Sequence, residues 1–241
     1  QNGSRHKSRG SSAIKMATQR WIPLESNPKV LNKYVENLGA SGQWQFVDVY
    51  GLDAELLMMV PRPVVAVMLL YPLTEKVNSK EIGKEDPSYP PSSYFIRQTI
   101  GNACGTVALV HALANNADRI PFADDKHFKK FLDQTKSMTP EEKAAFLEKD
   151  TDMGSAHEES AQEGETEAPS RDAHLKPHFV AFVNIDGNLY EMDGRKAAPV
   201  CHGKTSQDTL LEDTVKVVKE FMARDPDEIN FTLMALAKVD E

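Results

Sequence analysis

Residues 178–194 read HFVAFVNIDGNLYEMDG, and this stretch is the clearest structural signal in the chain. Two apolar runs, 178–185 and 189–192, flank Asp186-Gly187-Asn188. An Asp-Gly pair between apolar runs is typical of a tight β-hairpin turn. We therefore predict two antiparallel strands, and a sheet that is at least partly antiparallel.

The flanking sequence adds further strands and helices. Val64–Tyr71 is a continuous, β-branched-rich apolar run between two prolines, which is typical of a buried central strand. Residues 104–116 favour a buried helix, residues 209–224 an amphipathic helix, and residues 229–237 a final strand. This mixture indicates an α/β (α+β) fold. No internal repeat is present, and we expect a single domain over residues 16–241.

Charge and cysteine content narrow the class of protein. The chain of 241 residues has a net charge of −8. Residues 1–15 hold four bases and no acid, and read as an expression scar or a disordered extension, which leaves −12 on the rest. Such an acidic body disfavours nucleic acid and anionic membranes and favours a basic partner. With Cys104 and Cys201 alone, neither a disulfide framework nor a zinc ribbon can form. We expect a soluble, cytoplasmic monomer.

One long segment lacks any apolar pattern. Residues 151–176 contain seven acids against Arg171 and Lys176, and no aromatic residue. A polar segment of this length in a compact domain is usually functional or disordered. We therefore predict an irregular loop there.

The strongest chemical motif is Gln98-Thr-Ile-Gly-Asn-Ala-Cys104-Gly105-Thr. The loop delivers Cys104 to the first turn of a helix, where free N–H groups and the helix dipole favour a thiolate. The N–H of Cys104 and the amide of Gln98 are candidate donors to an oxyanion. The alternative is structural, because a free cysteine often packs as a small buried apolar residue.

The hairpin supplies a base for this nucleophile. A turn of two or four residues places an odd-numbered position opposite His178, near Arg195 or Ala197. Asp193 then lies on the same face as His178, close enough to orient the imidazole. The alternative for Asp193-Gly194 is an ordinary turn at the end of a strand. His111, on the apolar helix, is predicted to be a core residue.

No cofactor and no metal are predicted. Cys201-His202 has no second cysteine at ligand spacing. Gly203-Lys204-Thr205 ends like a phosphate-binding loop, but Ala198 stands where the first glycine belongs.

The motifs above, taken with several others, resemble the ubiquitin carboxyl-terminal hydrolases, in particular the short cytosolic isozymes. The resemblance covers nearly everything after Met16. It is carried by RWIPLESNP (20–28), QFVDVYGLD (45–53), PRPVVAVMLLYP (61–72), QTIGNACGT (98–106), HFVAFVN (178–184), DGNLYEMDGRK (186–196) and FMARDPDEINF (221–231). It implies a papain-like cysteine hydrolase fold with a mainly antiparallel sheet, flanking helices and a knotted backbone.

The resemblance also implies roles for individual residues. Cys104 corresponds to the nucleophile, His178 to the general base and acid, Asp193 to the carboxylate that orients it, and Gln98 to the oxyanion donor. Pro23-Leu24-Glu25 resembles a segment that contacts ubiquitin. Residues 152–175 resemble a crossover loop over the active site.

The implied activity is hydrolysis of small or unfolded adducts from the C-terminal glycine of ubiquitin through a thioester. Two alternatives stay open. One is a preference for a related modifier of the NEDD8 type, and the other is a ubiquitin-binding module that sequesters free ubiquitin.

Overall fold

The computed structural model describes residues 19–79, 81–166, 169–170 and 177–239. The basic extension predicted for residues 1–15 lies outside the described residues.

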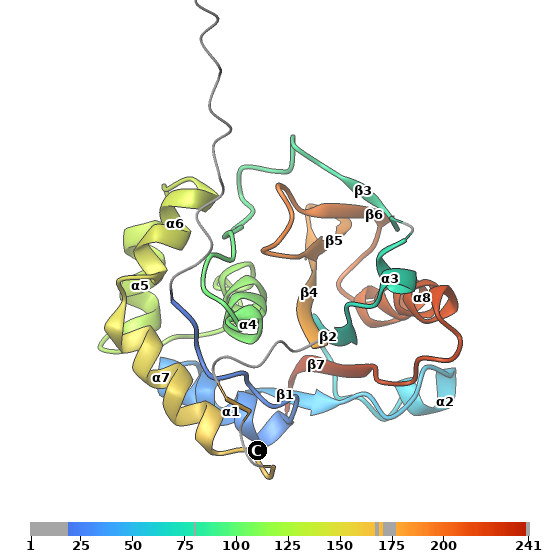
Figure 1. Ribbon diagram of the computed structural model, residues 1–241, viewed down its shortest axis with the longest axis horizontal. Helices are drawn as coiled ribbons and strands as arrows, with labels where there is room; N and C mark the ends of the chain where they lie inside the picture. Colours follow the sequence, from blue (N-terminus) through green and yellow to red (C-terminus); the bar gives the residue numbers. More distant parts are fainter. Residues whose placement is uncertain (1–18, 80, 167–168, 171–176, 240–241) are drawn as a thin grey trace, which may run out of the picture.

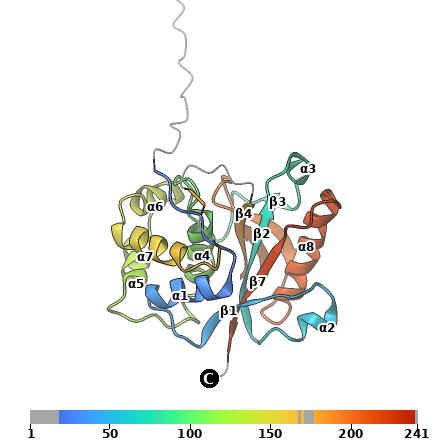
Figure 2. The same cartoon turned by 60° about the horizontal axis from the view of Figure 1, so that its bottom comes forward.

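A seven-stranded sheet runs through the molecule, and helices cover both of its faces (Figures 1 and 2). The strands are β1 (Trp44–Asp48), β2 (Val64–Pro72), β3 (Lys84–Glu85), β4 (Pro177–Ile185), β5 (Asn188–Met192), β6 (Val200–Lys204) and β7 (Thr232–Lys238). The helices are α1 (Pro28–Leu38), α2 (Ala54–Leu57), α3 (Glu75–Asn78), α4 (Cys104–Ala114), α5 (His127–Thr135), α6 (Pro140–Leu147), α7 (Thr151–Gln162) and α8 (Leu210–Arg224). Among the described residues, no helix has the length and apolar character needed to cross a membrane.

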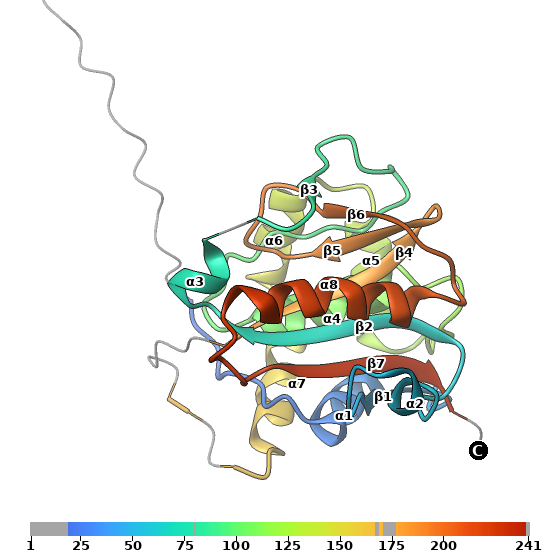
Figure 3. The ribbon, with the colours of Figure 1, turned by 90° about the vertical axis from the view of Figure 1, so that its right-hand side faces the viewer.

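The strand order in the sheet is β1-β7-β2-β4-β5-β6-β3, and every neighbouring pair is antiparallel. The last strand along the chain, β7, therefore lies between β1 and β2, as Figure 3 shows. The predicted mainly antiparallel α+β class is confirmed.

The sheet separates two apolar cores. Helices α1 and α4–α7 lie on one face, and α2, α3 and α8 on the other (Figure 2). Helix α4 packs against β4 and β2, while α8 packs against the same two strands from the opposite side. Strands β2 and β4 are therefore buried on both faces, which explains why their sequences are apolar without alternation.

The predicted hairpin is confirmed as β4 and β5 joined by a two-residue turn. Asp186 and Gly187 have φ of 50° and 77°, the left-handed conformations that a type I′ turn needs. Ile185 pairs directly with Asn188 across the turn.

The expectation of an irregular loop over 151–176 is wrong in its first half, where α7 forms. The Asp150 carboxylate caps this helix by accepting from the Met153 N–H (3.0 Å). Met153, His157 and Ala161 repeat every fourth residue and are buried against the core. Two apolar side chains and one histidine are too weak a pattern to stand out in a polar sequence. Residues 167–168 and 171–176 lie outside the described residues, so the knot stays a prediction.

Candidate active site

Cys104 is the first residue of α4, the position that the sequence predicted. The N-cap residue Ala103 makes no side-chain hydrogen bond, so no cap neutralises the N–H groups of the first turn. Asn102, in the left-handed region at φ 61°, donates from Nδ2 to the carbonyl of Trp21 (3.2 Å). The Trp21 N–H in turn donates to the Gly101 carbonyl (2.9 Å). The N-terminal segment thus fixes the loop that leads into Cys104.

The hairpin register brings His178 and Asp193 together. Ala181 pairs with Met192, so the next position along each strand sets Val180 opposite Asp193. Since alternate residues of a strand share a face, His178 lies on that same face. His178 Nε2 and Asp193 Oδ1 are 2.8 Å apart and both side chains are buried. The predicted contact is confirmed.

The Cys104 thiol interacts with His178 of this pair. Burial would raise the pKa of the Cys104 thiol, but the interaction with His178 and its charge bring it below its ordinary value. Burial would lower the pKa of His178, but Asp193 and Cys104 raise it to about 9. The pKa of Asp193 falls to about 2 against the effect of burial, because His178 and the Arg195 N–H (2.9 Å) donate to its carboxylate. These shifts favour a thiolate–imidazolium pair.

Gln98 lies beside the hairpin but its side chain is turned to its own loop. Its N–H donates to the Gly194 carbonyl (2.8 Å), next to Asp193. Its amide Nε2 donates to the Ile100 carbonyl (3.2 Å), while Oε1 is buried without a hydrogen-bond partner among the described residues. A Cβ at Gly194 would lie 2.7 Å from Val107 Cγ1 and 3.0 Å from the Gln98 nitrogen, so only glycine permits this approach.

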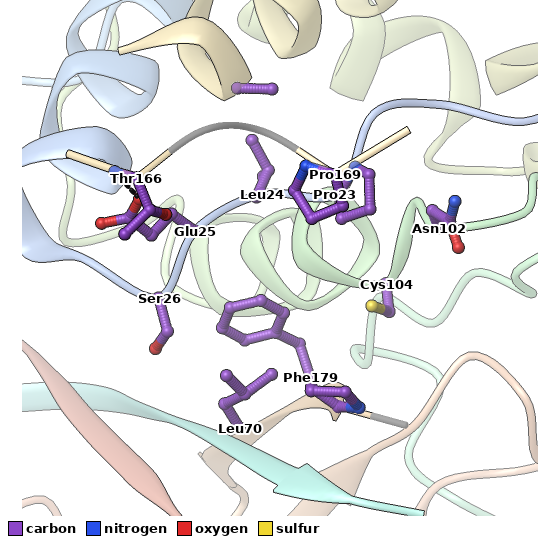
Figure 4. A pocket seen from close by; sticks show the side chains of 12 residues that line it. Pro23, Leu24, Glu25, Ser26, Leu70, Asn102, Cys104, Thr166, Pro169 and Phe179 are labelled. Atoms are coloured by element: carbon purple, nitrogen blue, oxygen red, sulfur yellow. Dashed lines mark hydrogen bonds between the residues drawn. The ribbon is translucent and has the colours of Figure 1, made fainter. Parts of the chain in front are cut away.

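A cavity of about 240 Å³ opens at Cys104 (Figure 4). Its lining is mostly apolar and comes from five parts of the chain: Pro23, Leu24, Glu25, Ser26, Leu70, Asn102, Cys104, Ala161, Thr166, Pro169, Pro177 and Phe179. The predicted segment Pro23-Leu24-Glu25 therefore lies at the same cavity as the thiol. Leu24 packs so closely over α4 that a Cβ at Gly105 would be 3.0 Å from its Cδ1.

The segment after α7 is tied to the opposite end of the cavity. Thr166 donates to the Glu25 carboxylate from both its N–H (3.1 Å) and its hydroxyl (2.8 Å), as Figure 4 shows. The hydrogen bond from Thr166 lowers the pKa of Glu25. Ala161 and Pro169 also line the cavity, so three described residues of the predicted crossover loop line the same cavity as Cys104.

His157 is a residue whose place the sequence did not predict. It is fully buried on α7, with Nε2 2.5 Å from the Ile22 carbonyl and Nδ1 2.7 Å from the Thr106 hydroxyl. It therefore links the segment before Pro23 to the first turn of α4. The spacing of Met153, His157 and Ala161 was the available sequence signal.

The described residues contain no group of three or more His, Cys, Asp or Glu side chains arranged to hold a metal ion. Both cysteines are free.

The chain matches known proteins over most of its length. The family model described as "Ubiquitin carboxyl-terminal hydrolase, family 1" matches residues 21–223. A ubiquitin carboxyl-terminal hydrolase of Aplysia californica is 63% identical over 209 residues, covering 87% of this chain and 98% of that protein. Ubiquitin carboxyl-terminal hydrolase isozyme L1 of Homo sapiens is 46% identical over 220 residues, covering 90% and 97%.

The fold is also similar to that of a solved structure. The catalytic domain of Trichinella spiralis UCH37, bound to ubiquitin vinyl methyl ester, aligns with a TM-score of 0.76 and 26% identity, over 93% of this chain and 99% of that one. The chain therefore belongs to the ubiquitin carboxyl-terminal hydrolases, family 1, and is a cysteine-type hydrolase.

Proposed function

We propose that the protein cleaves bonds at the C-terminal glycine of ubiquitin, with Cys104, His178 and Asp193 as the catalytic triad. The observation that carries the proposal is the 2.8 Å bond between His178 and Asp193, with His178 lowering the pKa of a thiol that lines a cavity. The names of the relatives and the ubiquitin adduct bound to the Trichinella spiralis domain support the substrate.

The reaction proceeds in two halves. The Cys104 thiolate attacks the glycine carbonyl, and the Cys104 N–H and the Gln98 amide donate to the oxyanion. His178 protonates the leaving amine or thiol as the C–N or C–S bond breaks, which leaves a thioester on Cys104. A water that gives its proton to His178 then hydrolyses the thioester and releases ubiquitin with a free carboxylate. For this role the Gln98 amide turns away from the Ile100 carbonyl when substrate binds.

The cavity lining and the negative net charge of the protein support ubiquitin as the partner and a limit on the size of the leaving group. Pro23, Leu24 and Glu25 form the wall that receives the C-terminal tail. Thr166 and Pro169, which line the same cavity as the thiol, limit leaving groups to small or unfolded ones. The acidic body attracts a basic tail, and we propose a cytoplasmic monomer as the working form.

The test is hydrolysis of a ubiquitin C-terminal fluorogenic amide by the unmutated protein and by Cys104→Ser. We expect turnover from the former and a loss of at least about 10³-fold in the variant. Gln98→Ala should retain the thioester chemistry but lose about 10²-fold in kcat. Binding of ubiquitin without turnover by the unmutated protein would instead identify a sequestering module. Faster cleavage of the matching NEDD8 amide would reassign the modifier.

A further inference from the structure

The loop that carries Gln98 is irregular in conformation but deeply buried. Tyr94, Phe95 and Ile96 have no helical or strand structure, and their exposed fractions are 7%, 0% and 0%. Buried backbone groups outside regular structure need partners from elsewhere in the protein. In this loop the partners are mostly side chains.

Two of these partners come from α4 and its C-cap. Asn115 accepts from the Tyr94 N–H (2.8 Å) and donates to the Tyr94 carbonyl (2.9 Å). His111 Nε2 accepts from the Ile96 N–H (3.1 Å), and its ring stacks on Phe95 with 5.2 Å between centroids. Burial lowers the pKa of His111 to about 4, so the ring is neutral at physiological pH and can accept. His111 is a core residue, as predicted, but it also holds this loop.

The third partner comes from α6. Lys143 is only 5% exposed, and its Nζ lies 3.4 Å from the Phe95 carbonyl and 4.3 Å from the centre of the Tyr94 ring. Within the described ranges, no carboxylate lies within 4.0 Å of this ammonium group, and burial lowers the pKa of Lys143. Burial of an ammonium group without a carboxylate partner costs free energy. The contacts of Lys143 with the Phe95 carbonyl and the Tyr94 ring offset part of that cost.

The loop ends at the catalytic hairpin. The Arg97 N–H donates to the Pro140 carbonyl (3.2 Å), and the Gln98 N–H donates to Gly194 (2.8 Å). Each N–H from residue 94 to 98, apart from that of Phe95, thus donates to a partner outside the loop. The helix that begins with Cys104 also supplies His111, two turns later. One rigid element therefore fixes both the nucleophile and the loop of the oxyanion donor.

We propose that His111 and Lys143 are positioning residues, which hold the backbone of residues 94–98 and so set where Gln98 stands relative to Cys104. The inference rests on the proposed role of Gln98. An oxyanion donor must lie within about 0.5 Å of its productive place, and a misplacement of about 1 Å can cost about 10²-fold in rate. Loss of either positioning side chain, His111 or Lys143, should therefore lower kcat more than it raises KM.

The first experiment compares His111→Met with His111→Gln, which are similar in length. Methionine removes the acceptor, whereas the glutamine Oε1 replaces Nε2 as acceptor for the Ile96 N–H. We expect kcat for the ubiquitin amide to fall about tenfold in His111→Met with KM within twofold, and to recover in His111→Gln. Leu109→Ala, which removes a buried side chain of α4 but no bond to the loop, should keep its kcat. Equal kcat in His111→Met and the unmutated protein would overturn the proposal.

A second readout separates the oxyanion from the thiolate. Iodoacetamide alkylates Cys104 by displacement of iodide, and no oxyanion forms. We therefore expect His111→Met to be alkylated at the rate of the unmutated protein. A parallel fall in alkylation and hydrolysis would mean that the thiolate itself is disturbed, which contradicts the proposal.

A double-variant cycle tests whether the positioning side chains act through Gln98. In a Gln98→Ala background, His111→Met should lower kcat no further, while full additivity would overturn the proposal. If Gln98→Ala alone kept full kcat, the oxyanion role under "Proposed function" would fail, and the triad would be untouched. Should His111→Met not fold, Lys143→Met serves in the same cycle, because it replaces a buried cation by an apolar side chain of similar size. A normal kcat in Lys143→Met would likewise count against the proposal.

Discussion

At the scale of single residues, the site depends on how three buried groups share charge. Asp193 raises the pKa of His178, and His178 lowers the pKa of Cys104, although burial opposes the charged form of each group. The bond of 2.8 Å and the N–H of Arg195 supply what water would otherwise provide. These pKa shifts favour a thiolate–imidazolium pair over the neutral pair.

This charge state predicts a bell-shaped pH dependence of kcat/KM. Activity should rise as pH passes the lowered pKa of Cys104, and fall as His178 loses its proton near its pKa of about 9. Asp193→Asn removes the carboxylate that raises the pKa of His178, so the alkaline limb should move to lower pH. Asp186→Asn, at the other end of the same hairpin, should leave both limbs in place. An alkaline limb that does not move in Asp193→Asn would contradict the conclusion that the Asp193 carboxylate raises the pKa of His178.

At the scale of elements, α7 connects parts of the site that are far apart in sequence. His157 bonds to the carbonyl of Ile22, ahead of the cavity wall, and to the hydroxyl of Thr106 in the first turn of α4. Since a carbonyl only accepts, the ring donates from Nε2 to Ile22. Trp21 packs against the same ring, with 4.5 Å between centroids.

The prediction for α7 concerns stability. His157→Ala leaves the Ile22 carbonyl and the Thr106 hydroxyl without this partner and opens a cavity. We expect the free energy of unfolding to fall by about 2–4 kcal/mol, measured by urea denaturation. His127→Ala, which breaks the partly exposed pair with Asp150, should cost less than about 1 kcal/mol. A similar loss in the free energy of unfolding for the two substitutions would show that the buried hydrogen bonds of His157 stabilise the fold no more than the partly exposed pair does.

At the scale of the whole molecule, the net negative charge affects how a substrate approaches the cavity. Residues 16–241 carry a net charge of −12. Strands β2 and β4 of the sheet contribute Leu70, Pro177 and Phe179 to the lining of the cavity. A long-range field of this sign raises the rate at which a basic tail arrives, while the chemistry at Cys104 is local.

Salt should therefore affect association and spare the chemical steps. Between about 0.02 and 0.3 M salt, we expect kcat/KM for the ubiquitin amide to fall severalfold while kcat stays constant. Alkylation by iodoacetamide, a neutral reagent, provides the control and should not change. A kcat/KM that is independent of salt would show that electrostatic attraction does not speed association with the substrate.

Those features that depend on local sequence could be predicted. The Asp186-Gly187 turn sets the register, and the register alone places Asp193 on the face of His178. The Thr139 hydroxyl and the Glu142 carboxylate form a capping box at the start of α6, which also depends on local sequence alone. Features that depend on distant packing could not be predicted. Helix α7 exists because its buried face meets α1 and the segment around Trp21, and a polar sequence does not reveal that.

The site shows the same division. Local spacing indicated Cys104 at a helix start, but the way in which His111 and Lys143 hold residues 94–98 arises only when α4 and α6 meet that loop. The turn of the Gln98 amide toward Ile100 is also a property of the folded loop, and no spacing in the chain predicts it.

The place of β7 has a consequence for how the protein is made in the cell. This strand is translated after every other strand, but it lies between β1 and β2 in the finished sheet. While the ribosome still holds residues 232–238, β1 has no neighbour and β2 lacks one of its two. The nascent chain therefore carries an open sheet edge until translation has passed this strand, and such an edge can pair with other chains.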